Sequence, residues 1–114
     1  MRGATSFLVV LVTCPDRRRA HTLAAALVKA RVAACVNLIP AVQSLFWWEG
    51  RVDQAREVLL VIKTAASSFP KLRALVTRLH PYQVPEIIAL PIARGHAPYL
   101  AWIRKSLQPR RRVP

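Results

Sequence analysis

Hydrophobic residues form two continuous runs, which predict strands covered on both faces. The first, "SFLVVLVT", lies within 5–13, and the second, "VLLVI", covers 58–62. Short unbroken apolar runs of this kind are typical of buried strands. The apolar core of the first run, 7–12, is too short to cross a bilayer or to serve as a secretory signal core. We therefore expect a buried first strand, no membrane association and, by default, a cytoplasmic protein.

Three segments show helical periodicity instead. The first begins at Pro15-Asp16, with proline and an acid suited to a helix start, and should end near Arg31. The second should be capped by Ser67-Ser68 and end before Pro81, and a short third helix should run from Pro98. The apolar stripes of the first two helices are Ala20, Leu23, Leu27 and Ala30, and Phe69, Leu72, Leu75, Val76 and Leu79.

The middle of the chain predicts a long hairpin. Its first arm covers 35–48, and Glu49-Gly50 forms a two-residue turn in which glycine supplies a positive φ. Pro40 cannot donate to a strand ladder, so we expect a bulge or bend there. A fourth strand at 86–92 contains Pro91 and should therefore lie at a sheet edge or bend.

The resulting order, β-α-β-β-α-β plus a terminal helix, predicts an α+β ferredoxin-like sandwich with an extra C-terminal helix. One domain should cover residues 1–107, and 108–114 should form a basic flexible tail. Both main helices should cover one sheet face and leave the other open. Because Phe46, Trp47 and Trp48 point alternately to both sides of a strand, one aromatic side has no cover within the chain. We therefore expect a homo-oligomer.

The charge is strongly basic, at +13. Discounting Arg110, Arg111 and Arg112 leaves +10, so basic residues are spread through the domain as well as concentrated in the tail. A solvated basic surface is one explanation, and a nucleic-acid or other polyanion-binding protein is the other. No nucleic-acid recognition motif is present, so such binding would use non-specific charge alone.

Four segments resemble the CutA family of divalent-cation tolerance proteins: "ACVNLIPAVQSLFWWEG", "EVLLVIKT", "HPYQVPEIIALPI" and "PYLAWI". The likeness runs from about Leu8 to Leu107. It implies a ferredoxin-like fold, a homotrimer, and a role in copper or other divalent-metal tolerance and binding. Trimeric small-ligand signalling proteins share this architecture, which leaves a signalling module as an alternative. The metal ligands implied by the family are incomplete, because Val12 or a neighbour replaces a strand cysteine and Leu79 replaces a second histidine.

Cys14 and His80 are the candidate metal ligands, since a thiolate with an imidazole suits copper or zinc. Cys14 lies beside a helix start, where the dipole would lower a thiol pKa, or else it is a small core residue. His80 is either a ligand or a helix C-terminal cap. Copper or another divalent metal is expected to bind weakly at the surface and not as a structural cofactor. His80→Ala should then leave the melting temperature nearly unchanged.

The remaining cysteine and histidines carry no ligand prediction. Cys35 should be buried and inert, and His21 and His96 should lie on the surface.

A second constellation comprises Trp48, Lys63, Tyr82 and Glu86, which could line an intersubunit cleft in a trimer. The alternative is a structural interface in which Lys63 pairs with Glu86. No catalytic dyad, nucleophile elbow, HExxH motif or phosphate loop is present, so we expect no enzyme.

Overall fold

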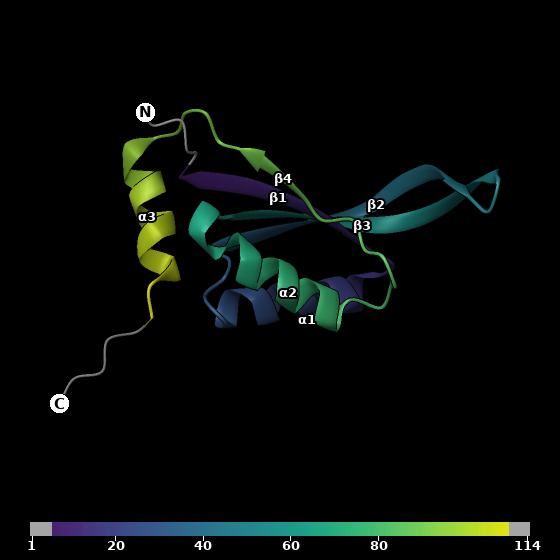
Figure 1. Cartoon of the computed structure of the whole chain (residues 1–114), viewed down its shortest axis with the longest axis horizontal. Helices are drawn as coiled ribbons and strands as arrows, with labels where there is room; N and C mark the ends of the chain where they lie inside the picture. The colour runs from purple at the N-terminus through teal and green to yellow at the C-terminus, as the bar shows by residue number, and fades with distance from the viewer. Residues whose placement is uncertain (1–5, 110–114) are drawn as a thin grey trace.

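The computed structural model describes residues 6–109, and the predicted tail arginines lie outside this range. Its four strands form one antiparallel sheet of order β2-β3-β1-β4 (Figure 1). The predicted α+β ferredoxin-like class is confirmed. The elements are β1 (Phe7–Cys14), α1 (Arg17–Lys29), β2 (Cys35–Trp48), β3 (Arg51–Ala65), the 3-10 turn η1 (Ala66–Ser68), α2 (Phe69–Leu79), β4 (Ile88–Pro91) and α3 (Ala97–Leu107).

One face of the sheet packs against α1 and α2 and forms the core (Figure 1). Alternate residues of the central strands point toward the helices, as period-2 geometry requires. The fully buried strand residues include Val10, Val12, Leu60 and Ile62, and the fully buried helix residues that face them include Leu27, Leu72 and Val76. At about 1.5–3 kcal/mol for each large side chain removed from water, this set provides the main stabilisation of the chain.

The opposite sheet face is only partly covered. At one end α3 packs beside β3, and the Arg104 guanidinium lies 4.8 Å from the centre of the Phe7 ring. The prediction of a wholly open face is therefore corrected. Toward β4 the same face stays accessible, with Ile88 and Leu90 each 47% exposed.

The long hairpin extends beyond the helical layer (Figure 1). Its pairing register shifts between Ile39 and Val42, and Ala41 has a φ of 62°. This irregularity directly follows Pro40, so the predicted bulge is confirmed. Glu49 and Gly50 both have positive φ, 49° and 80°, as a type I′ turn requires.

Several predicted helix and strand boundaries are wrong. Asp16 is the N-cap of α1, accepting a 2.8 Å hydrogen bond from the Arg19 N–H, rather than a first-turn residue. The end of α1 at Lys29, with its C-cap at Ala30, agrees with the predicted end near Arg31, where the backbone enters the left-handed region. Ser68 makes no capping bond, since η1 leads directly into α2. The strand β4 is shorter than 86–92 but lies at the edge, as Pro91 predicted.

None of the helices within residues 6–109 is long and apolar enough to span a membrane.

The turn gives a direct stability prediction. Gly50→Val should destabilise the fold by about 1–3 kcal/mol, because a β-branched residue is strained at positive φ. No heavy atom lies within 4 Å of a Cβ placed at Gly50, so backbone strain alone would produce the loss. Glu49→Asn is the matched control and should be neutral or slightly stabilising, because asparagine tolerates this region. Urea unfolding at fixed protein concentration measures both, and an unchanged midpoint for Gly50→Val would contradict the assigned turn.

Candidate functional site

His80 follows α2 and lies against the end of β1, with only 7% of its surface exposed. Its Nδ1 accepts a 3.0 Å hydrogen bond from the backbone N–H of Tyr82. Its Nε2 lies 2.7 Å from the carbonyl oxygen of Thr13. Since a backbone N–H can only donate, Nδ1 carries a lone pair and Nε2 carries the proton that it donates to Thr13. In this arrangement His80 is a neutral, buried connector of α2 to β1.

This geometry corrects two expectations for His80. The ring does not cap the carbonyls of α2, because both nitrogens bond elsewhere. It is also not a surface ligand. The melting temperature should therefore be sensitive to its removal.

Cys14 is the last residue of β1 and is fully buried, 0% exposed. Burial, with smaller contributions from Asp16 and Glu57, raises the pKa of the Cys14 thiol to about 11. The expected lowering by the helix dipole is therefore wrong, because desolvation of the thiolate outweighs it. At neutral pH the group is a protonated thiol.

The structure brings the two predicted ligands together. Cys14 Sγ lies 3.8 Å from His80 Nε2. A zinc ion bound at about 2.3 Å from sulfur and about 2.05 Å from nitrogen, at a tetrahedral angle, would hold these atoms about 3.6 Å apart. The separation suits a shared metal ion, but the Nε2 proton is directed at the Thr13 carbonyl, so the ring would have to give up that bond before it could bind one. Residues 6–109 contain no group of three or more His, Cys, Asp or Glu side chains close enough to hold one.

A buried carboxylate beside this pair was missed by sequence reasoning. Glu57 on β3 accepts a 2.8 Å hydrogen bond from the Tyr82 hydroxyl. Burial and this bond raise the pKa of Tyr82 to about 12. The available signal was Glu57 itself, an acid adjoining the apolar run 58–62. Because such an acid needs a partner, a nearby hydroxyl or cation was to be expected.

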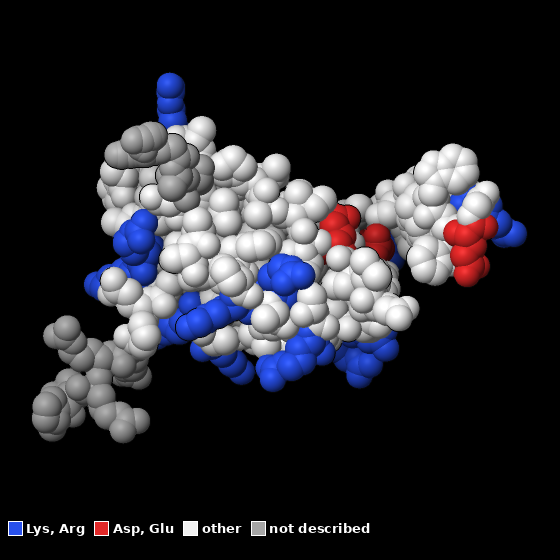
Figure 2. All heavy atoms as spheres, viewed as in Figure 1, with Lys and Arg blue, Asp and Glu red and all other residues white. Residues whose placement is uncertain are grey.

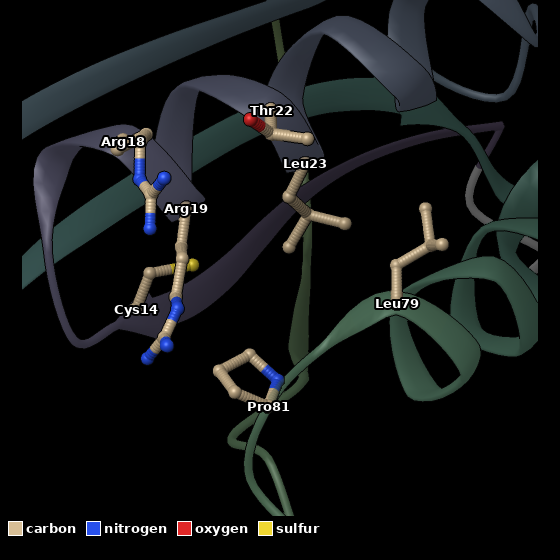
Figure 3. A pocket seen from close by; sticks show the side chains of 7 residues that line it. All are labelled: Cys14, Arg18, Arg19, Thr22, Leu23, Leu79 and Pro81. Carbon is tan, nitrogen blue, oxygen red and sulfur yellow. The ribbon is translucent and has the colours of Figure 1, made fainter.

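A shallow pocket of about 250 Å³ opens beside Cys14 (Figure 3). Arg18 and Arg19 reach it from the first turn of α1, while Leu79 and Pro81 reach it from the end of α2. The two guanidiniums place positive charge at this entrance, which disfavours the approach of a cation. The complete lining is Cys14, Arg18, Arg19, Thr22, Leu23, Leu79 and Pro81.

The four residues of the predicted cleft do not form one site within a single chain. Trp48 pairs with Arg51 at the hairpin tip, whereas Lys63 pairs with Cys35 at the other end of β3. Twelve residues of strand separate Arg51 from Lys63, about 40 Å. Lys63 donates to the Asn37 side chain and lies 3.8 Å from Cys35 Sγ. Any site that combines Trp48 with Lys63 therefore needs different copies of the chain.

The remaining predicted residues are accounted for more simply. His21 and His96 are exposed, as expected. Cys35 is only partly buried, so the expected full burial is wrong. Cys35 begins β2, an edge strand of the sheet, where it pairs with Lys63.

Comparisons with known proteins agree on one family. A protein-family sequence model described as "CutA1 divalent ion tolerance protein" matches residues 8–106. A divalent-cation tolerance protein CutA from Thermus thermophilus is 51% identical over 98 residues, 86% of this chain and 95% of that protein. The solved Thermus thermophilus structure has a TM-score of 0.86 at 50% identity, covering 88% of this chain and 97% of that one. A structure from Archaeoglobus fulgidus, described as a periplasmic divalent cation tolerance protein CutA, has a TM-score of 0.87 at 35% identity, covering 90% and 99%.

Proposed function

The chain belongs to the CutA1 divalent ion tolerance protein family, and from this membership we propose that it is a homotrimer that binds copper or another divalent metal weakly and reversibly. The observation that carries the metal-binding proposal is the 3.8 Å separation of Cys14 Sγ and His80 Nε2. These are a soft and a borderline ligand at a spacing that a tetrahedral metal ion can bridge.

Weak binding follows from what the two ligands must give up. Cys14 must lose a proton held with a pKa of about 11. His80 must free Nε2 from the Thr13 carbonyl, and moving the ring proton to Nδ1 would set it against the Tyr82 N–H. Each lost buried hydrogen bond costs about 1–3 kcal/mol. The metal is therefore an exchangeable ligand, because the apolar core exists without it.

The trimer is supported by exposed aromatic surface on both sides of the hairpin. Trp47 is 76% exposed on one side and Trp48 is 59% exposed on the other. Large side chains at such positions are typical of protein interfaces. In the trimer we propose that Trp48 of one copy lies near Lys63, Tyr82 or Glu86 of another. A small ligand bound in that cleft, as in a signalling module, is the alternative function.

The affinity for metal should depend steeply on pH. Zinc is a suitable probe because it does not oxidise thiols. Between pH 6.5 and 8.0 the zinc affinity should rise about tenfold per pH unit, because each ion displaces the thiol proton throughout the range below the Cys14 pKa of about 11. Calorimetric titration of the purified protein measures this slope.

Cys14→Ser is the matched variant for that titration. It should lower zinc affinity and flatten the pH dependence, because no thiol proton is then displaced. Cys35→Ser should leave both unchanged. Equal slopes for the parent and Cys14→Ser would place the site elsewhere.

The cellular compartment is a separate proposal. We keep the cytoplasmic location, since both cysteines of the chain are free thiols in the structure. Fractionation of cells that produce the protein tests it.

A further inference from the structure

The helices α1 and α2 carry positive charge and no negative charge on their outer surface. Together with Arg31 they contribute eight Lys and Arg residues and no Asp or Glu. All eight are exposed, and this set, which we term the basic face, is Arg17, Arg18, Arg19, Lys29, Arg31, Lys71, Arg73 and Arg78. Because the apolar stripes of both helices point into the core, the basic side chains are directed outward.

The acidic residues lie mostly elsewhere. Glu49, Asp53 and Glu57 belong to the hairpin and Glu86 to the loop before β4, while Asp16 caps α1. Figure 2 shows Lys and Arg gathered along the lower side, over α1 and α2, and Asp and Glu toward the hairpin. Within residues 6–109 the structure has one ion pair, Arg19 with Asp16 at 3.8 Å. A generally arginine-rich composition would not by itself place basic and acidic side chains on different parts of the surface, so this separation indicates a binding surface more specifically than the net charge does.

We propose that the basic face binds the phosphate backbone of double-stranded nucleic acid without reading its sequence. Six of its eight members are arginine, whose planar guanidinium matches phosphate oxygens in a two-point hydrogen bond. The 13 residues of α1 extend about 20 Å. Phosphates along one strand of a duplex are spaced by 3.4 Å, so a helix of this length spans about six nucleotides.

A duplex fits this surface better than a single strand or a membrane. Single-strand binding uses aromatic platforms on which bases stack. The exposed Trp and Tyr residues lie on the hairpin, on α3 and in the loop after α2, and the exposed large apolar residues of α1 and α2 are Val28 and Leu79. Membrane-surface helices insert an apolar side into the bilayer, and α1 and α2 bury theirs in the core.

The test is fluorescence anisotropy with a 30-base-pair duplex at 50–200 mM salt, with chelator present to keep it independent of metal binding. The logarithm of the parent's affinity should fall linearly with the logarithm of salt concentration, by about 0.9 for each phosphate contacted. The basic-face variant combines Arg18→Gln, Arg73→Gln and Arg78→Gln. It should lower affinity at 100 mM salt about tenfold or more and reduce the slope by about 2–3.

The control removes the same charge elsewhere, with Arg51→Gln, Arg56→Gln and Arg94→Gln, and should change affinity less than about threefold. If those hairpin substitutions alter the solution mass, Arg94→Gln, Arg104→Gln and Lys105→Gln replace them. Duplex DNA and duplex RNA are run as separate arms, and the tighter arm identifies the source of the phosphate backbone.

Three results would overturn the proposal. The first is no binding by the parent to either duplex at 100 mM salt. The second is an equal loss in the basic-face variant and its control, which would assign binding to net charge alone. The third is binding to phosphatidylserine vesicles, but to neither duplex, which would assign the surface to membranes.

Discussion

His80→Ala should lower the free energy of unfolding by about 2–4 kcal/mol. The substitution leaves the Thr13 carbonyl and the Tyr82 N–H without the ring that joins them, in a site where His80 itself is only 7% exposed. Each buried group left unsatisfied costs about 1–3 kcal/mol, and a small cavity adds to the loss. Thermal and urea unfolding of metal-free protein, at one fixed concentration, measure the effect.

The matched control is His21→Ala, which removes an exposed histidine from α1. It should change stability by less than about 0.5 kcal/mol, as is usual for surface positions. If the unfolding of His80→Ala coincides with that of the parent, the ring does not hold α2 against β1, and the hydrogen bonds described above contribute nothing to stability.

Trp48→Ala should weaken assembly by about 2 kcal/mol or more for each interface, the effect typical of a buried aromatic anchor. In one chain Trp48 is 59% exposed, so its removal should not disturb the core formed by β1, β3, α1 and α2. Sedimentation across a concentration series should therefore show dissociation at concentrations where the parent remains three times 12.8 kDa.

Arg73→Ala is the control for assembly, because Arg73 is exposed on α2, away from the hairpin. It should sediment like the parent. A parent protein that is a stable 12.8 kDa monomer at micromolar concentration would remove the basis of the trimer proposal.

The strands and the hairpin could be predicted from the sequence because their signals are local. Adjacent residues alone determine three of these features: the strand at 58–62, the Glu49-Gly50 turn and the irregular pairing after Pro40. The helix starts were less accurate. A serine pair can cap a helix or continue as a 3-10 turn, and the choice at Ser68 depends on how β3 meets α2.

The site could be predicted only in part. Cys14 and His80 were identified by residue type, but their burial arises from contacts 66 and 67 positions apart, which no local pattern reveals. The Tyr82–Glu57 bond spans 25 positions and was missed for the same reason. The thiol pKa was placed on the wrong side of its ordinary value because the sequence indicates the adjacent helix start but not the depth of burial.

Identifying the protein atoms that bind the metal is the most direct test of the proposed metal site. Zinc K-edge X-ray absorption of the parent, loaded with Zn(II), reports which elements contact the ion. We predict both sulfur and imidazole nitrogen as direct ligands, with the sulfur signal lost in Cys14→Ser and kept in Cys35→Ser. Coordination by nitrogen and oxygen alone in the parent would contradict the assignment of the metal to the Cys14–His80 pair.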